Sequence, residues 1–138
     1  MKAATSTSSR DKSLNKLGEI EVELDKKYVF HIPLYKYVDN ELIALDMDDI
    51  IDELIMQFSE KGYDSLYMSM VKGYYKTRCF DEIIITLYVS SEFLEKHEFP
   101  ESIFKEWFRK NNELLGQEEF AYECGNKMHI EKLTHSQS

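Results

Sequence analysis

The residues of this sequence best suited to binding chemistry lie in one short segment, Lys72 to Arg78, which reads KGYYKTR. Three cations, Lys72, Lys76 and Arg78, accompany two tyrosines, Tyr74 and Tyr75. Ammonium and guanidinium groups make charge-assisted hydrogen bonds to carboxylates and phosphates, and arginine also stacks on aromatic rings. The segment therefore predicts a site for an anionic small molecule or a protein partner. The alternative is an ordinary solvated hairpin tip, because surface loops are commonly charged.

A second candidate for chemistry is His31, which alternates with Phe30 and Ile32 and so lies on the opposite face of a strand. Imidazole titrates near neutral pH and can act as a general acid or base. Glu82, before a later strand, is the other candidate acid or base. The competing interpretation is a histidine that simply has hydrogen-bond partners. His129 lies in another predicted strand, and two histidines of unknown separation do not define a metal site.

Other side chains that bind metals or cofactors do not form recognisable motifs. Asp46, Asp48 and Asp49 are followed by Ile51 and Gln57 where an EF-hand loop needs glycine and glutamate. The three aspartates suit a helix N-terminus instead, with Asp46 as N-cap. A nucleotide loop, a nucleophile elbow and zinc-ligand spacing are all absent from the sequence. The sequence therefore predicts no metal site and no cofactor.

Charge is unevenly distributed along the 138 residues, whose formal net charge is −9. Residues 1–18 carry four cations against Asp11, a charge of +3, so the remainder carries −12. Such an acidic domain repels phosphates, which argues against direct nucleic-acid binding. The acidic runs at 19–25 and 118–123 leave a further interpretation open, an acidic inhibitor of a nucleic-acid-binding protein. Solvated sheet edges are the simpler explanation of those runs.

Composition indicates a globular domain in a reducing compartment. Hydrophobic residues make up 43% of the chain, enough for a core. Cys79 and Cys124 lack the spacing of a disulfide framework or redox pair, which predicts reduced thiols and a cytoplasmic location. No apolar run reaches the ~18 residues of a membrane helix, and the N-terminus lacks the apolar segment of a signal peptide. We therefore expect no membrane partner.

Periodicity predicts both helices and strands. Alternating apolar residues predict an edge strand over 19–24. Apolar stripes predict two helices, over 46–62 and 100–116, which Gly62 and Gly116 terminate. The other predicted strands cover 27–38, with a bulge or an unpaired stretch at Pro33, then 41–45 as a short strand or an extended approach, a long hairpin over 62–90, and finally 118–124 and 127–133.

The order of these elements predicts the fold. From residue 27 it is strand, helix, strand, strand, helix, strand, the order of the α+β ferredoxin-like βαββαβ two-layer sandwich. An extra N-terminal strand and a C-terminal β-hairpin would be added to it. Right-handed crossovers place both helices on one face of the sheet. We expect a single α+β domain over 19–133, between a disordered basic tail at 1–18 and a disordered C-terminus at 134–138.

The other face of the sheet is predicted to be open. Tyr67, Val71, Ile84 and Tyr88 share this face of the long hairpin with polar neighbours. A face turned only to solvent would be more polar than this. The composition therefore predicts a homodimer through the open sheet face, with these four residues at the interface.

Three short motifs follow one another in a defined order. They are Leu34-Tyr35 before an Asp39-Asn40 turn, Gly62-Tyr63-Asp64 leading to Gly73-Tyr74, and Leu115-Gly116-Gln117-Glu118 at the end of the second helix. Through them, the stretch from about 28 to 133 resembles a family of small ferredoxin-like domains of unknown function. The family's aromatic residue after the glycine is supplied by Tyr74 or Tyr75, and its acid before the next strand is matched by Glu82. Lys36 and the extra N-terminal strand depart from the pattern. The resemblance implies the fold and no established activity.

The sequence thus favours a non-enzymatic ligand-binding, protein-binding or regulatory module that uses the basic, tyrosine-rich hairpin loop. A small enzyme remains the alternative, with a cleft on the open face, His31 or Glu82 as acid or base, and tyrosines as hydrogen-bond donors. A concave site of roughly several hundred Å³ with convergent polar groups would favour the enzyme, and a flat or filled face would favour the binding module.

Overall fold

The computed structural model describes residues 22–133. The predicted tails at 1–18 and 134–138, and residues 19–21, lie outside the described residues. The elements follow in the order β1 (Lys26–Pro33), β2 (Tyr35–Val38), β3 (Glu41–Ala44), α2 (Asp48–Glu60), β4 (Leu66–Tyr75), β5 (Arg78–Val89), α3 (Ser91–Leu94), α4 (Pro100–Leu115), β6 (Glu119–Cys124) and β7 (Lys127–Lys132). This is a mixed α+β fold, as the sequence predicted.

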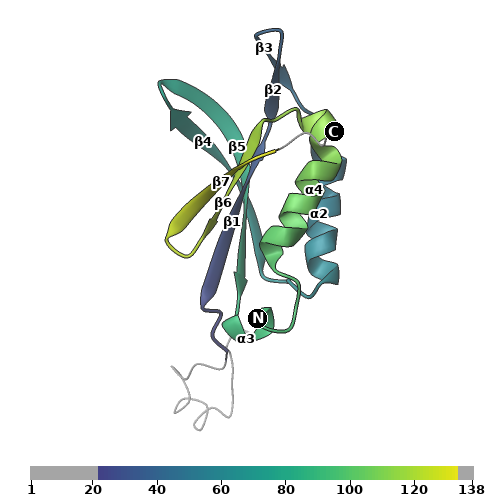
Figure 1. Cartoon of the computed structure of the whole chain (residues 1–138), viewed down its shortest axis with the longest axis vertical. Helices are drawn as coiled ribbons and strands as arrows, with labels where there is room; N and C mark the ends of the chain where they lie inside the picture. Colours follow the sequence, from purple (N-terminus) through teal and green to yellow (C-terminus); the bar gives the residue numbers. More distant parts are fainter. Residues whose placement is uncertain (1–21, 134–138) are drawn as a thin grey trace, which may run out of the picture.

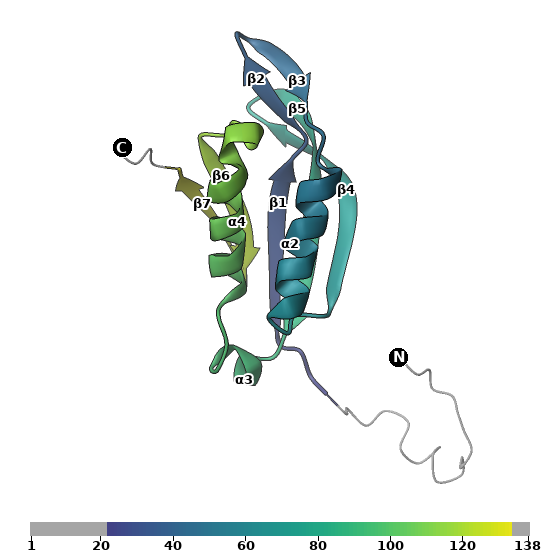
Figure 2. The ribbon, with the colours of Figure 1, turned by 90° about the vertical axis from the view of Figure 1, so that its right-hand side faces the viewer.

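Five strands form one antiparallel sheet in the order β4-β5-β1-β6-β7, and β2 pairs with β3 in a separate hairpin. The long helices α2 and α4 lie side by side over one face of the sheet (Figures 1 and 2). The opposite face carries no helix, and we call it the open face. The predicted C-terminal β-hairpin is present as β6 and β7.

The core lies between the helices and the sheet. Alternate residues of β1, among them Phe30 and Ile32, turn toward the helices and are completely buried. Phe104 of α4 is also completely buried, and its ring centroid lies 4.7 Å from that of Phe30. Trp107 donates its indole N–H to the backbone oxygen of Ile50 at 2.8 Å, which ties α4 to α2. The apolar stripes of both helices are therefore explained by one shared core.

The strands β4 and β5 extend closer to the turn than the sequence indicated. Strand pairing continues to Tyr75 opposite Arg78, and only Lys76 and Thr77 form the turn. Both turn residues have positive φ, 51° and 65°, which matches the right-handed twist of the flanking strands. The predicted loop from Lys72 to Arg78 is therefore mostly strand.

Two strand predictions at the start of the domain were wrong. The predicted strand over 27–38 divides at Leu34, after which β2 leaves the sheet to pair with β3, because Pro33 cannot extend the hydrogen-bonded ladder. The predicted edge strand over 19–24 is not present in its described part, Val22 to Leu24. A strand over these residues would come directly before β1 in the chain, but both edges of β1 are already paired, with β5 and with β6. Asp25 instead accepts hydrogen bonds from the backbone N–H and hydroxyl of Ser91.

The start of α2 also differs from the prediction. Met47, not Asp46, is the N-cap residue, and it makes no side-chain capping hydrogen bond. Met47 is buried in the core instead. Asp48 and Asp49 lie in the first turn, where negative charge is favourable. Across residues 22–133, none of the helices has the length and apolar character needed to cross a membrane.

Candidate functional site

A histidine held between two carboxylates lies on the open face. The Nδ1 atom of His31 is 2.9 Å from Oε1 of Glu82, and its Nε2 atom is 2.7 Å from Oε2 of Glu123. The side chains of His31 and Glu82 are 17% and 21% exposed, whereas that of Glu123 is 40% exposed. We call these three residues the acid–histidine cluster. Glu123 is its most accessible member.

Strand register explains how three distant residues meet. His31 lies at the centre of the sheet, in β1. Pro33 is paired with Glu82 of β5, and Val29 is paired with Glu123 of β6. The two carboxylates are thus diagonal neighbours of the imidazole on opposite sides, within reach of long side chains. The cluster therefore depends on the antiparallel pairing of β5, β1 and β6.

The cluster favours the charged form of the histidine. The pKa of His31 is raised, chiefly by its hydrogen bond to Glu82, while burial opposes the shift and the bond to Glu123 adds to it. An imidazolium can donate from both ring nitrogens, and each donor here has a carboxylate acceptor. With His31 charged, the cluster has one cation and two anions, and its net charge is −1. It is therefore suited to attract a cationic group.

Aromatic and apolar side chains share the open face with the cluster. Tyr67 and Tyr88 make an edge-to-face pair with ring centroids 6.2 Å apart, and the Lys27 ammonium lies 5.9 Å from the centroid of Tyr88. Tyr67 is 64% exposed, so its ring is available for a ligand. By register, the open face is shared by Tyr67, Ser69 and Val71 of β4, Glu82, Ile84, Thr86 and Tyr88 of β5, Val29 and His31 of β1, Ala121 and Glu123 of β6, and Met128 and Ile130 of β7.

The four residues predicted to form a dimer interface, Tyr67, Val71, Ile84 and Tyr88, do lie on this face together. Their common placement follows from the alternation of side chains along β4 and β5. Binding of a second copy there stays a prediction.

The residues of the predicted basic site, in contrast, do not all lie on one face of the hairpin. Lys72 and Tyr74 alternate with Tyr75, so the side chains point to different faces of the hairpin. Lys72 makes an ion pair with Asp81 at 3.0 Å, and this interaction raises the pKa of the lysine. The side chains of the segment therefore divide between the two faces of the hairpin, and ligand binding by them stays a prediction.

Two other side chains of that segment interact locally as well. The Arg78 guanidinium lies 5.1 Å from the ring centroid of Tyr37 in β2, and the Lys76 ammonium lies 5.3 Å from that of Tyr75. Such cation–π contacts are a common way to accommodate exposed cations beside aromatic rings. The Arg78 contact connects the hairpin tip to β2, whereas the Lys76 contact stays within the tip. Neither contact involves a residue of the acid–histidine cluster.

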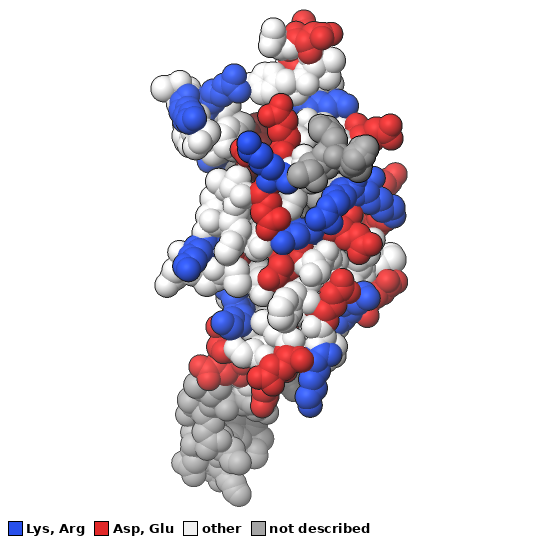
Figure 3. All heavy atoms as spheres, in the orientation of Figure 1, with Lys and Arg blue, Asp and Glu red and all other residues white. Residues whose placement is uncertain are grey.

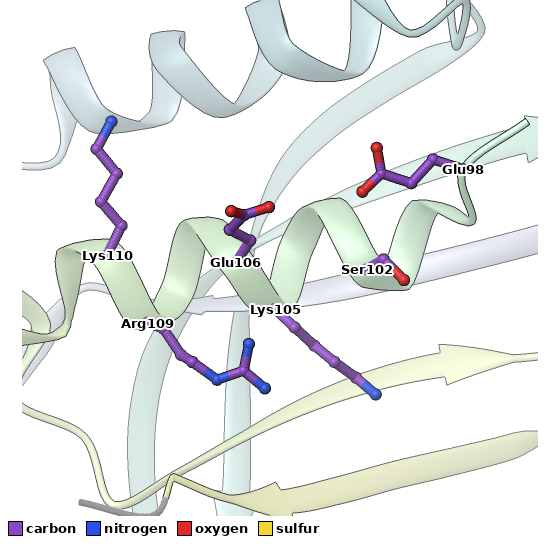
Figure 4. A pocket seen from close by; sticks show the side chains of 6 residues that line it. All are labelled: Glu98, Ser102, Lys105, Glu106, Arg109 and Lys110. Carbon is purple, nitrogen blue, oxygen red and sulfur yellow. The ribbon is translucent and has the colours of Figure 1, made fainter. Parts of the chain in front are cut away.

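Two hollows lie on the helical side of the molecule. A hollow of about 620 Å³ follows the outer surface of α4, and its lining includes Glu98, Lys105 and Arg109. Figure 4 shows that these side chains point in different directions and do not converge on one point. A second hollow of about 340 Å³ lies between α2 and α4. Neither is the cleft on the open face that the enzyme alternative predicted.

Charge on the visible surface is mixed. Figure 3 shows acidic and basic side chains interspersed over the helical side of this view, without a continuous acidic area. Ion pairs such as Lys105–Glu131 and Lys61–Glu98 account for part of this pattern. An inhibitor that imitates nucleic acid would need a contiguous negative surface, so this arrangement does not favour that alternative.

Sequence patterns missed one member of the cluster. Glu123 was assigned to an acidic run on a sheet edge, but β6 is an inner strand flanked by β1 and β7. His129, considered as a partner of His31, instead stacks on Tyr122 with centroids 4.9 Å apart. The pairing of Tyr122 with Phe30 places it on the helical face, away from His31. Strand register, which alternation alone does not give, was the missing information.

Comparisons with known proteins extend these observations. The chain matches no protein-family model. No curated protein matches it either. The resemblance to a small ferredoxin-like family therefore stays a prediction.

Two solved structures are similar to this one. A phage SAM lyase in complex with S-methyl-5′-thioadenosine has 11% sequence identity and a TM-score of 0.52, over 83% of this chain and 97% of that one. A phage SAM lyase in the apo state has 12% identity and a TM-score of 0.49, over 86% of this chain and 100% of the other. At this identity the first similarity shows a shared fold.

This similarity overturns the functional prediction. A non-enzymatic binding module built on the basic hairpin loop is contradicted, because the phage protein that shares the fold is a lyase, which is an enzyme. The basic charges of the hairpin are also distributed over different local contacts. The prediction failed because it weighed local charge contrast along the chain, whereas the acid–histidine cluster forms only when three strands pair.

Proposed function

We propose that the protein is a lyase that cleaves a carbon–sulfur bond of S-adenosylmethionine (SAM) and releases S-methyl-5′-thioadenosine. The observation that carries the proposal is the acid–histidine cluster on the same open face as the exposed Tyr67 and its neighbour Tyr88. The fold shared with a phage SAM lyase over nearly all of that chain supports it. Because fold alone does not establish function, the residues of the site must be compatible with the substrate.

The charge of the cluster suits this substrate. SAM carries a sulfonium and an ammonium group, and Glu123 is the carboxylate accessible enough to accept a hydrogen bond from the ammonium. His31 would act through the carboxylates, holding both of them in position with its two N–H groups. Glu82, less exposed and bonded to the same ring, would fix the orientation of the imidazole.

The tyrosines suit the other end of the substrate. Tyr67 lies in the same cross-strand row as Thr86, Val29 and Glu123. Three strand spacings of about 4.8 Å separate Tyr67 from Glu123, roughly 14 Å between the backbones. This span suits a ligand with a nucleoside at one end and an amino acid at the other. We propose that adenine stacks on Tyr67 while the amino-acid end lies at Glu123.

The reaction that we propose needs no proton transfer. The substrate's own carboxylate oxygen forms a bond to the γ-carbon, and the electron pair of the breaking C–S bond goes to sulfur. The products are a neutral thioether, S-methyl-5′-thioadenosine, and a four-carbon aminolactone. Opposite charges neutralise each other in the transition state, so a surface with little water favours the step. Val29 is paired with Glu123 and Ile84 with His31, so two apolar residues adjoin the cluster in the sheet.

A cover over the open face would exclude water further. The homodimer predicted through Tyr67, Val71, Ile84 and Tyr88 is one such cover, but the proposed reaction does not depend on that dimer. Apolar side chains exposed on this face, such as Met128 at 52% and Ile130 at 58%, are consistent with such a partner. The cytoplasmic location predicted from Cys79 and Cys124 forms part of the same proposal.

We also propose that the topology is ferredoxin-like. The order β6-β1-β5-β4 corresponds to fourth, first, third and second strands of a βαββαβ unit, with α2 and α4 as the connecting helices. In this description β7 extends one edge, and the β2–β3 hairpin is an insertion between the first strand and the first helix.

The proposal is tested by measuring S-methyl-5′-thioadenosine by liquid chromatography and mass spectrometry after incubating the purified protein with SAM. We expect product above an enzyme-free blank. Glu123→Gln removes the carboxylate charge and should lower kcat/KM by about 10- to 100-fold, the effect of losing one charge-assisted hydrogen bond. Glu119→Gln, an exposed change in the same strand, is the matched control and should retain wild-type activity. Product formation no faster than the blank refutes the function.

A further inference from the structure

Among residues 22–133, no strand pairs with the outer edge of β4. Strand β4 ends the sheet on one side, next to β5 (Figure 2). The backbone N–H of Tyr88 donates to the oxygen of Ser65 at 3.1 Å, so Ser65 directs its backbone groups toward β5. Because hydrogen-bonding direction alternates along a strand, the even-numbered residues of β4 direct their N–H and C=O groups away from β5. This row of donors and acceptors can pair with another strand.

The side chains of β4 leave this edge unprotected. Met68 and Met70 are 56% and 69% exposed, although they lie on the face that α2 covers elsewhere. The opposite outer strand, β7, carries Lys127, Glu131 and Lys132, charged residues of the kind that prevent edge pairing. The two edges therefore differ in charge density: β7 has Lys127, Glu131 and Lys132 within a short strand, whereas the longer β4 has only Lys72.

The pattern along β4 is complementary to itself when the strand is reversed. On the helical face, β4 presents Leu66, Met68, Met70 and Lys72 in that order, and Asp64 precedes the strand by two residues. If Met68 lies opposite itself, Leu66 faces the partner's Met70 and Asp64 faces the partner's Lys72. A register displaced by two residues places Leu66 opposite the partner's Lys72 and loses both ion pairs.

We propose that β4 pairs antiparallel with β4 of a second copy of this chain, around a two-fold axis at Met68. The two sheets then join into one sheet of ten strands, and the partner has the same sequence because the interface is isologous. The apolar pairs lie at the centre of the contact, and the Asp64 pairs with the partner's Lys72 lie at its two ends. Complementary charge is what favours a second copy over another protein, because opposite charges directly across a strand pair stabilise it.

The ion pairs would also offset part of the electrostatic repulsion between two acidic molecules. The formal net charge of −9 per chain opposes self-association. Lys72, whose side chain is 63% exposed, bonds Asp81 of its own chain and has further N–H donors for a second carboxylate. Each copy would therefore contribute Lys72, the cation of β4, to the contact.

This interface is separate from the open face and does not require the proposed reaction. In the joined sheet, Tyr67 would lie beside the partner's Ser69, at the border between two open faces. The contact thus brings the two open faces side by side without covering them. A dimer made through Ile84 and Tyr88 would instead stack one open face on another, so variants distinguish the two arrangements.

The first experiment measures mass in solution over a range of concentrations by light scattering. We expect the wild type at twice 16.4 kDa and Met68→Pro at 16.4 kDa. Proline removes an N–H that points away from β5, so the sheet within each chain keeps its hydrogen bonds. Met68→Leu is the matched control and should remain dimeric. A wild type that stays at 16.4 kDa overturns the proposal.

The second experiment exchanges the charges, and it remains decisive if the proline variant fails to fold. Asp64→Lys alone sets lysine opposite the partner's Lys72, and Lys72→Asp alone sets two aspartates opposite each other, so each variant should be monomeric. Mixing the two variants restores both attractive pairs, and native mass spectrometry should detect a heterodimer. Failure of the mixture to associate contradicts the register. A wild-type dimer that persists in Met68→Pro but is lost in Ile84→Asp assigns association to the open face and also overturns the proposal.

Discussion

Replacing His31 with glutamine tests whether the acid–histidine cluster exists as a charged unit. Glutamine keeps a polar side chain of similar length but cannot become a cation. The raised pKa of His31, caused chiefly by Glu82, means that protonation is more favourable in the folded chain than in the unfolded one. A group with a raised folded-state pKa stabilises the fold below its unfolded value, about 6.5 for histidine, and the contribution is lost as pH rises through the folded-state value.

The size of the effect follows from the burial of the two hydrogen bonds. The bond to Glu82 joins side chains that are 17% and 21% exposed, and a charge-assisted bond of this kind contributes about 1.5–3 kcal/mol. The bond to Glu123 is more exposed and contributes about 0.5 kcal/mol after solvent screening. We therefore expect His31→Gln to lower the free energy of unfolding by about 2 kcal/mol more at about pH 5.5 than at about pH 8.5.

Chemical denaturation at the two pH values measures this difference, with Glu119→Gln as the control in the same sheet. The double variant of His31→Gln with Glu82→Gln should show less additional loss than the sum of the single changes, because the first change already removes the charged partner. Equal destabilisation by His31→Gln at both pH values would refute the argument that the imidazolium is what holds the two carboxylates.

Three further predictions concern the fold. Phe104→Ala should lower the free energy of unfolding by about 3–5 kcal/mol in urea titrations, because a completely buried ring is lost, and Phe104→Leu should cost less. Gly116→Ala should cost about 1 kcal/mol because Gly116 has a φ of 61°, and Gly116→Asn should cost less since asparagine tolerates that conformation; equal losses would contradict the backbone argument. Tyr63→Phe removes the hydroxyl that donates to the Glu98 backbone oxygen and should cost about 1 kcal/mol by thermal unfolding. An unchanged melting temperature would show that this hydrogen bond adds nothing.

Much of the α+β architecture could be predicted from local patterns. The stripes of α2 and α4 are continuous in sequence, and Gly62 and Gly116 mark where the helices end. The long hairpin was recognisable from alternation in both of its strands. These features depend on residues near one another in the chain, which is why periodicity was sufficient.

The errors arose where pairing between distant strands decides the outcome. The apolar alternation of residues 27–38 does not show that the chain leaves the sheet after Pro33, since β2 finds its partner only in β3. Glu123 looked like one member of an acidic run until β6 was found beside β1. The same pairing turned His31 and Glu82, which the sequence offered as alternatives, into hydrogen-bonded partners.

The basic hairpin shows the opposite error, in which a local signal was given too much weight. Lys72 to Arg78 is distinctive in sequence, but strand alternation sends its side chains to different faces. The ion pair of Lys72 with Asp81 and the contact of Arg78 with Tyr37 then satisfy two of its charges. Charge contrast along a chain therefore does not by itself identify a binding site.

The most direct test of the proposed function uses SAM whose methyl carbon is labelled with ¹³C, followed by NMR during incubation with the protein. The lyase reaction keeps the methyl group on sulfur, so the label should move from the sulfonium signal to the methylthio signal of S-methyl-5′-thioadenosine, faster with the wild type than with Glu123→Gln. A label that stays in the sulfonium, or that moves at the rate of the enzyme-free sample, would contradict the proposal. Transfer of the label to another acceptor would contradict it equally.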